Sequence, residues 1–369
     1  MNRDGTDAEA WTEWHDGIPG FAGPSLEALY GSLYSSLPQL SLGNLDNVNT
    51  YLAGSANGTH ALFLYTRNGR SARVVNEGMR ISAADAARFA AQLFRRWPET
   101  DRIAFHAIAL DDSPAGQPTI RFVLDEDILI DLPASEAGYL ASLGKSTRKS
   151  LRQRLARAQG LCHCLVPGRE VDAPLVEQLI DFNRARLSAK QRVSALDSRA
   201  AHQLLALVRA CGMASVVRLN GRLCGGTLAC RFGEDVYSLV NAHDPAFDHL
   251  GMGNLSRHLM IVAAIDAGAR RFHLLGGNFS SKRSCGARRQ ALQHLLIYRN
   301  RWRMATDLPH IVAMAMRALR YRVGVALDDS AMDVPPGGEH GYLSALLRRL
   351  LGTARLMRRR LRGAPAEAR

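Results

Sequence analysis

Apolar residues in the first half of the chain change from strand-like runs to helical spacing and back. Two apolar runs at 61–66 and 71–75 flank an Asn-Gly pair, which accepts the positive φ angles of a tight turn, so we expect a β-hairpin. Ser82 is a good N-cap, apolar residues follow it at helical spacing, and Pro98 ends the pattern, so an amphipathic helix is expected. Two further strands are expected at 103–110 and 120–124.

The second half shows a longer succession of patterns. Two helices are followed by three apolar strands in a row, and an Asn-Gly turn joins the first two of these strands. A helix entered through Gly251 and ended by Gly268 then leads to two more strands. The expected bounds are 175–187 and 200–211 for the first helices, and 214–219, 223–232, 235–241, 271–275 and 294–298 for the strands.

This order of elements predicts a meander followed by a β-α-β crossover. The sheet is then antiparallel in its first part and parallel at the crossover. We expect the strands to separate where the pairing mode changes, which leaves a cleft beside the crossover helix. Backbone N–H groups of Gly253, Asn254 and Leu255 would lie at the positive end of that helix, which suits a pyrophosphate.

Length and patterning divide the chain into four parts. Its 369 residues exceed one typical domain, and 47% of them are hydrophobic, which is enough to form folded cores. We expect an irregular lead at 1–45 with a short helix near 26–33. An N-terminal α/β lobe at 46–135, a second domain at 136–305 and a helical basic extension at 306–369 follow.

The chain is strongly basic. It has 47 Lys and Arg against 34 Asp and Glu, a formal net charge of +13, which favours phosphates, nucleic acid or an anionic membrane surface as partners. Residues 137–168 contain no acid, and a stripe of leucines runs beside basic residues there. The leucines are Leu140, Leu143, Leu151 and Leu155, and the basic residues are Lys145, Arg148, Lys149, Arg152, Arg154 and Arg157. This stretch indicates either a phosphate or RNA contact or a solvated helix face.

A second basic stretch lies near the C-terminus. Residues 343–362 combine leucines and arginines without an acid, at helical spacing. Peripheral contact with a membrane is one interpretation, a docking helix or RNA contact is another, and a solvated terminal helix is the third.

The remaining composition points to a reduced, cytoplasmic protein. Six cysteines fall at no framework-like spacing, and Cys162-His163-Cys164 lacks a second pair of ligands, so no metal site is expected. The first residues lack the features of a signal peptide, and no uncharged apolar run approaches the ~20 residues of a spanning helix. We expect a cytoplasmic protein, with contact at the inner face of the membrane through 343–362 as an option.

The order and spacing of several weak motifs from 137 to 303 resemble a known enzyme family. They are the basic stretch, the Asn-Gly hairpin, the Gly251-Met252-Gly253 turn and the run from Gly276 through Lys282 to Ala287. Together they look like a GNAT-superfamily acyltransferase of the FemAB and CelD-like (BioF2-like acetyltransferase) branch. That resemblance implies an α/β (α+β) fold with a GNAT-like mixed sheet flanked by helices. It further implies two GNAT-like lobes, the first degenerate, and a C-terminal helical extension.

The resemblance also implies roles for individual residues. The donor pyrophosphate would bind at Gly251, Met252, Gly253, Asn254 and Leu255, and Lys282 would lie near the acceptor or the transferred acyl group. Candidates for proton transfer are His243, Asp244 and His273, and candidates for substrate binding are Tyr237, Asn241, Asn278 and Arg148. The chain departs from the family at Ser281 and Cys285, where relatives usually carry aromatic residues.

The implied activity is that of an N- or O-acetyltransferase, which moves an acyl group from acyl-CoA, most simply acetyl-CoA, to an amine or hydroxyl of an amino sugar, glycan precursor or similar metabolite. Polysaccharide or cell-envelope biosynthesis is the setting that the family suggests. Two alternatives stay open. One is a FemX-like transferase that uses aminoacyl-tRNA, for which the basic stretch would bind RNA, and the other is a non-catalytic scaffold of a polysaccharide-assembly complex.

Overall fold

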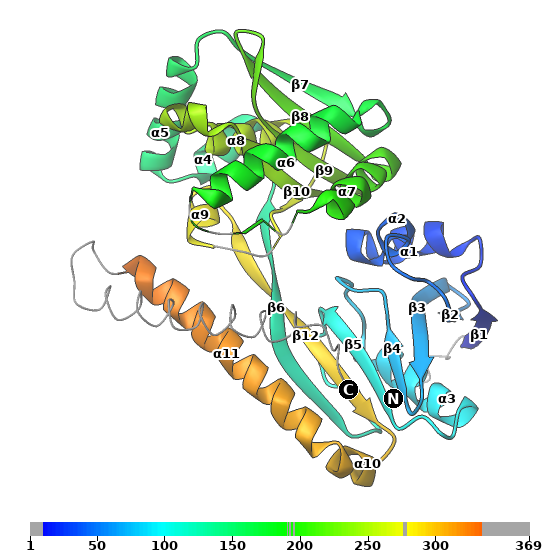
Figure 1. Cartoon of the computed structure of the whole chain (residues 1–369). Helices are drawn as coiled ribbons and strands as arrows, with labels where there is room; N and C mark the ends of the chain where they lie inside the picture. The colour runs from blue at the N-terminus through cyan, green and yellow to red at the C-terminus, as the bar shows by residue number, and fades with distance from the viewer. Residues whose placement is uncertain (1–9, 190, 192, 195, 276–278, 334–369) are drawn as a thin grey trace, which may run out of the picture.

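The computed structural model describes residues 10–333 except 190, 192, 195 and 276–278. Within these residues the strands form one 12-stranded sheet in the order β1-β2-β3-β4-β5-β12-β6-β11-β10-β9-β8-β7. The sheet runs through two lobes, which Figure 1 shows one above the other. Two long strands, β6 (Thr119–Asp131) and β12 (Arg288–Tyr298), pass from one lobe to the other.

The N-terminal lobe is a sheet covered by helices. Its strands are β1 (Trp11–Asp16), β2 (Val48–Ser55), β3 (Gly58–Asn68), β4 (Ser71–Val74) and β5 (Arg102–Ile108). Its helices are α1 (Ala22–Tyr30), η1 (Leu33–Ser35), α2 (Leu37–Leu40) and α3 (Ala83–Arg96). Stacked and edge-to-face aromatic rings, among them Tyr51, Phe63 and Phe89, fill the space beneath α3. The predicted hairpin and the helix capped by Ser82 are confirmed.

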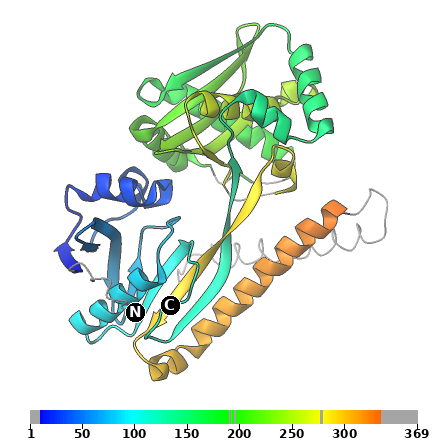
Figure 2. The same cartoon turned by 180° about the vertical axis from the view of Figure 1, so that it is seen from behind.

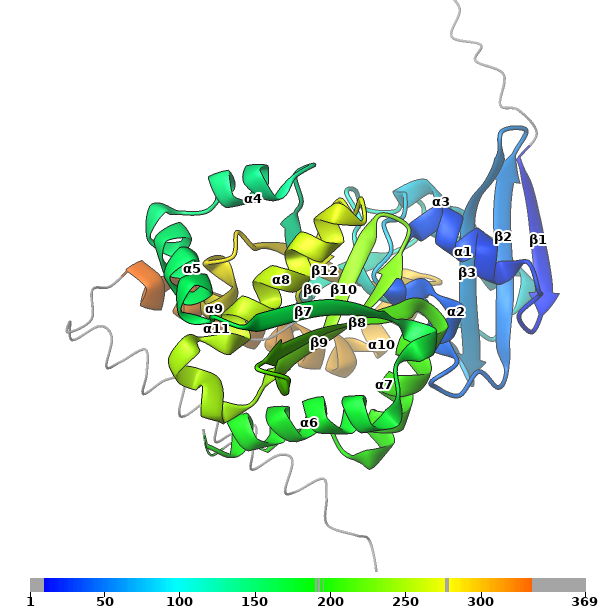
Figure 3. The same cartoon turned by 90° about the horizontal axis from the view of Figure 1, so that it is seen from above.

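The C-terminal lobe is a three-layer arrangement, seen from above in Figure 3. Its strands are β7 (Leu161–Pro167), β8 (Gly212–Leu219), β9 (Arg222–Phe232), β10 (Asp235–His243) and β11 (Arg271–His273). Helices α6 (Ala173–Ser188) and α7 (Ser198–Cys211) cover one face, and α4 (Glu136–Ser142), α5 (Lys145–Arg157) and α8 (Met252–Asp266) cover the other. Shorter segments are η2 (Gly168–Glu170), η3 (Pro245–Leu250) and α9 (Ser280–Arg283).

The predicted meander and crossover are confirmed. Asn220 and Gly221 both have positive φ angles, 49° and 81°, as the tight turn between β8 and β9 requires. Strand β10 pairs antiparallel with β9 and parallel with β11 after the crossover through α8. In the described residues the pairing with β11 ends at Tyr237, whereas β10 continues to His243. The two strands therefore separate at this point, as the change of pairing mode predicts.

The structure differs from the sequence analysis at three points. The lead at 1–45 is not irregular from residue 11 onward, because β1 pairs with β2 along its whole length and α1 packs against β3. The leucine stripe of 137–168 is divided between two separate helices, α4 and α5, and Leu155 of the stripe is 40% exposed. Strand β7 was missed, because its side chains are mostly exposed and its Cys-His-Cys sequence lacks an apolar face.

After β12 the chain turns into α10 (Arg301–Thr306) and then α11 (Leu308–Asp333), which crosses the outer face of β6 and β12. Figure 2 shows α11 from behind as a long rod beside these strands. The expected helix at 311–319 is therefore the middle of a longer one, and the expected basic helix at 343–362 lies outside the described residues. Among the described residues no helix has the length and apolar character to cross a membrane.

Candidate active site

A cavity of about 610 Å³ opens where β10 separates from β11. Side chains and backbone of β10 from Ser238 to His243 form its floor, the turn before α8 closes one end, and the C-terminal part of α6 forms a side wall. Leu274, Leu275, Ser281 and Lys282 complete the wall on the β11 side. We call this the crossover cavity.

The turn before α8 is built around a glycine that no other residue replaces easily. Gly251 has φ 64°, in the left-handed region. A Cβ there would lie 1.5 Å from the guanidinium of Arg154, whose Nη1 donates a hydrogen bond to the Gly251 carbonyl at 3.1 Å. Arg154 thus fixes this turn to α5. Among the five residues expected at the donor site, Met252 and Leu255 direct their side chains into the core.

The backbone N–H groups that are available at this end of α8 differ from those expected. Those of Asn254 and Leu255 donate to the Gly251 carbonyl at 3.0 and 3.2 Å. The first N–H groups of a helix have no partner inside it, which here means those of Met252 and Gly253. An anion would therefore meet the N–H groups of residues 252 and 253 and not those of Asn254 and Leu255.

Asn241 ties the strand to the helix. Its Nδ2 donates to the Gly253 carbonyl at 2.9 Å, and its Oδ1 accepts a hydrogen bond from Thr227 at 3.1 Å. The side chain lines the crossover cavity, but both ends of its amide are used within the protein. The contacts indicate that Asn241 positions the first turn of α8.

His243 lines the crossover cavity at the end of β10 and is 8% exposed. Its Nε2 is 2.6 Å from Oδ1 of Asp248, and its ring lies against Gly253, where a Cβ would be 2.8 Å from Nδ1. A carboxylate that holds one ring nitrogen orients the other nitrogen for proton transfer. Asp244 does not line the cavity: it accepts the N–H of Ala246 and pairs with Arg222 at 2.6 Å.

Lys282 lines the crossover cavity on the β11 side. Its Nζ donates to the carbonyls of Leu274 and Leu275 at 2.8 and 2.6 Å. Burial, and next the positive charge of Arg257, lower the pKa of Lys282 to about 8. Leu275 has φ 57°, an uncommon conformation for a leucine, so the lysine holds a strained backbone at the end of β11.

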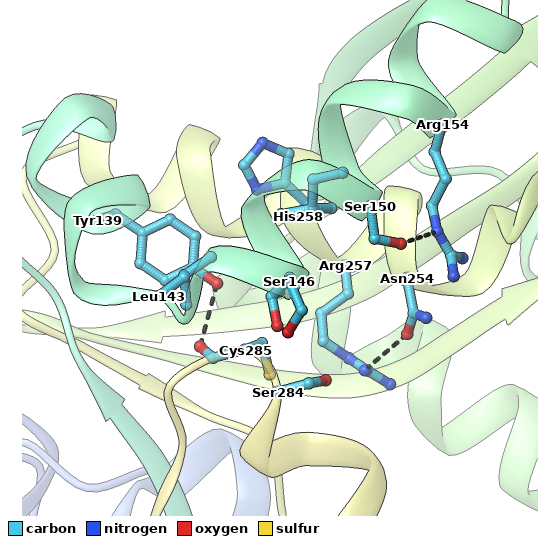
Figure 4. Close-up of a pocket in the computed structure, with 12 residues that line it drawn as sticks. Tyr139, Leu143, Ser146, Ser150, Arg154, Asn254, Arg257, His258, Ser284 and Cys285 are labelled. Carbon is cyan, nitrogen blue, oxygen red and sulfur yellow. Dashed lines mark hydrogen bonds between the residues drawn. The ribbon is translucent and has the colours of Figure 1, made fainter.

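A second cavity, of about 290 Å³, lies between α5 and the first turns of α8 and is drawn in Figure 4. It is lined by the hydroxyls of Ser146, Thr147 and Ser150 together with Arg154 and Arg257. Asn254 and Arg257 line both this pocket and the crossover cavity, so the two adjoin. Arg148 lines neither; its Nη1 donates to the Ala141 carbonyl at 3.3 Å.

Tyr237 and His273 belong to a different cavity, between the lobes, of about 540 Å³. Their rings stack with centroids 4.2 Å apart. His273 Nδ1 is 2.5 Å from Asp127 of β6, and its Nε2 is 3.3 Å from Asp235 of β10. Burial opposes the charged imidazolium, but the two carboxylates outweigh it and raise the pKa of His273.

The interlobe cavity meets the crossover cavity at Leu275, which lines both. Its acidic residues outnumber its arginines: the acids are Glu77, Asp125, Glu126, Asp127 and Asp235, and the arginines are Arg80, Arg271 and Arg288. This acidic lining contrasts with the net charge of the chain. Asn278, expected to bind substrate, lies outside the described residues.

Several residues of these cavities were missed at the level of sequence. Arg257 follows Gly253 by four positions, so both lie on one face of α8, and this spacing could have identified it. Asp248, Arg154 and Asp127 had no such signal, because their partners are brought to them by the turn of η3, by α5 and by the long strand β6.

Comparisons with known proteins agree with this geometry. Residues 145–283 match the family model described as an acetyltransferase (GNAT) domain. The crystal structure of FemX is similar in fold, with a TM-score of 0.54, 10% identity, and coverage of 78% of this chain and 96% of FemX. The structure of L-PGS from Bacillus licheniformis gives a TM-score of 0.49 at 13% identity, with coverage of 82% and 98%. No curated protein matches in sequence. Residues 145–283 are thus similar to a GNAT acetyltransferase domain, and the similarity to FemX shows that the fold is GNAT-like.

Proposed function

We propose that this chain is an acyltransferase of the FemAB and CelD-like branch that moves an acyl group from acyl-CoA to an amine. The amine would belong to an amino sugar, a glycan precursor or a similar metabolite. One observation carries the proposal: the crossover cavity has a helix N-terminus at one end and the His243–Asp248 pair beside it. This combination supplies an anion site and a proton acceptor beside a space of about 610 Å³.

The donor would enter along α8. Its pyrophosphate would accept hydrogen bonds from the N–H groups of Met252 and Gly253, with Arg257 close by. The pocket of Figure 4 adjoins this point and offers hydroxyl and guanidinium donors for a further phosphate of the donor. The thioester would then lie in the crossover cavity along β10.

The reaction needs a deprotonated amine and a stabilised oxyanion. The amine attacks the thioester carbonyl, the tetrahedral intermediate collapses, and the CoA thiolate leaves and takes up a proton. His243, oriented by Asp248, would accept the proton of the attacking amine. Beyond Tyr237 the edge of β10 is not paired with β11 in the described residues, so its backbone N–H groups are candidates to stabilise the oxyanion.

The acceptor would come from the interlobe cavity. Its carboxylates, each paired with an arginine or histidine, suit a polar acceptor that bears hydrogen-bond donors, and Tyr237 offers an aromatic wall. Leu275 stands between this cavity and the crossover cavity, so an acceptor bound there would approach the acyl group from the β11 side. Tyr237 and His273, which the sequence analysis assigns to substrate binding and proton transfer, would then contact the acceptor. Lys282 would hold the backbone of Leu275 in place between the two substrates.

A second candidate function is transfer from aminoacyl-tRNA. The observation that favours it is α5, which borders the pocket of Figure 4 and belongs to a stretch, 137–168, without an acidic residue. Lys149 and Arg152 on this helix are exposed to solvent, as RNA backbone contacts would require.

Calorimetric titration with acetyl-CoA tests the proposal, with intact protein beside Gly253→Leu and Gly20→Leu. A side chain at 253 would collide with His243, whereas none of the described atoms lies within 4 Å of a Cβ at 20. Binding that is lost only in Gly253→Leu supports the donor site. If the intact protein binds no acetyl-CoA but retains aminoacyl-tRNA in a salt-sensitive manner, the second candidate holds; binding of neither favours the non-catalytic scaffold.

A further inference from the structure

Helix α11 carries an apolar stripe that no described part of the chain covers. Its inner face packs on β6 and β12 through Ile311, Met314 and Ala318. A separate set of large apolar residues on its outer face is 42% to 57% exposed: Leu308, Val312, Met316, Leu319 and Val323. These five, which we call the outer stripe, follow one another at intervals of three or four residues and so share one helix face.

The outer stripe extends beyond one helix. Trp302 of α10, immediately before α11, is 71% exposed. Scattered single apolar residues on a surface need no explanation, but a continuous row over four helical turns does. The acyl-transfer proposal does not use it, because the described walls of the crossover and interlobe cavities contain no residue of α11.

The charged residues of α11 beside the outer stripe are basic as far as residue 327, although Asp307 directly precedes the helix. No acidic residue occurs from 308 to 327, and Arg320 and Arg322 each stand next in sequence to a stripe residue, about 100° around the helix and on opposite sides. Neither forms an ion pair with a described residue, and both are exposed. An apolar face bordered by arginines, with a tryptophan at one end, is the pattern of a helix that lies in the interface of an anionic bilayer.

We propose that the outer stripe of α11 docks this protein on an anionic lipid surface. Leucine, valine and methionine side chains enter the boundary between headgroups and acyl chains, while the flanking arginines contact lipid phosphates. Two other occupants fit the charges less well. A second copy placed on the stripe, or the chain's own segment 343–362, would bring arginines against arginines.

Vesicle co-sedimentation of the full chain tests this surface. Intact protein, Leu319→Glu and Ala313→Glu are each mixed with vesicles of phosphatidylcholine alone or with one third phosphatidylglycerol. Both substitutions add one negative charge at an exposed position of α11, but only residue 319 is in the outer stripe. We expect the intact protein and Ala313→Glu to bind the anionic vesicles, and Leu319→Glu to bind them at least tenfold more weakly.

Three outcomes would overturn the proposal. Equal binding by all three proteins would assign membrane contact to another segment, such as 343–362. Absence of vesicle binding with a dimer that Leu319→Glu dissociates in sedimentation would make the stripe an interface between copies. Stronger vesicle binding by Leu319→Glu would indicate that the stripe covers the segment 343–362 in the intact chain. Thermal unfolding of each variant, expected to be unchanged because both sites are exposed, confirms that the comparison is between folded proteins.

Discussion

At the scale of single residues, the His243–Asp248 pair is the part of the crossover cavity best suited to move a proton. We expect His243→Ala to lower kcat by about 10²- to 10⁴-fold, the usual contribution of a general base, with little change in affinity for acetyl-CoA. Asp248→Asn should cause a smaller loss, since the imidazole remains but loses its oriented carboxylate. Steady-state kinetics and calorimetry measure the two quantities.

His249 provides the matched control for that experiment. It is exposed on the same turn, and its Nδ1 contacts only the Ala246 carbonyl among the described residues. His249→Ala should therefore keep wild-type kcat. Equal losses in His243→Ala and His249→Ala would show that the turn as a whole, and not the imidazole of residue 243, is required.

Lys282 predicts a dependence of stability on pH. Its folded pKa of about 8 lies below its ordinary value, so the unfolded chain binds more protons between these two values, and this group makes stability rise with pH over that window. The gain should be on the order of 3 kcal/mol at most between pH 7 and pH 11. Urea unfolding at several pH values should show a steeper rise for the intact protein than for Lys282→Met; parallel curves would contradict the shifted pKa.

At the scale of elements, the turn between η3 and α8 depends on Gly251 for two reasons, its positive φ and the guanidinium of Arg154. Gly233 has a similar φ of 53°, but a Cβ there would meet none of the described atoms within 4 Å. Gly233→Ala should therefore cost about 1–2 kcal/mol from backbone strain alone. Gly251→Ala should cost clearly more, because Arg154 must also move, and chemical denaturation measures both. Equal costs would mean that Arg154 does not hold the turn.

The elements of the C-terminal lobe were predictable because their signals are local. The Asn220-Gly221 turn, the glycines around α8 and the apolar strands specify the meander and crossover without help from the rest of the chain. The long strands β6 and β12 were recognised only at one end. Each has charged residues in its middle or at its start, as at Asp125 and Arg288, which pair with side chains of other elements and so do not alternate with apolar positions.

The candidate site, like the fold, was predictable only where its signals are local. Gly251, Gly253, His243 and Lys282 follow from a turn, a strand end and a resemblance, and the structure brings all four around one cavity. The separation of His273 and Tyr237 into another cavity depends on β6 and on the N-terminal lobe, which supply Asp127 and Tyr34. Contacts of this kind join residues more than a hundred positions apart and leave no pattern in the sequence.

At the scale of the whole molecule, β6, β12 and α11 make the two lobes one structure. His273 lies at this junction, since its imidazole joins β11 to Asp127 of β6 and Asp235 of β10. Its folded pKa is raised above the ordinary value, so its contribution to stability is present below that ordinary value and is lost as pH rises through the folded pKa. The junction between the lobes should therefore be strongest in mildly acidic solution.

The prediction is that His273→Gln loses more stability at pH 5.5 than at pH 9, because the favourable pairing of the charged imidazolium is present only at the lower pH. Denaturant unfolding at the two pH values measures it, and His202→Gln, on the exposed surface of α7, is the control that should lose equally little at both. A loss for His273→Gln that is the same at both pH values would show that the ring acts through its stacking on Tyr237 alone. A larger loss in acid would instead make proton uptake at His273 a determinant of how firmly the interlobe cavity is held between the lobes.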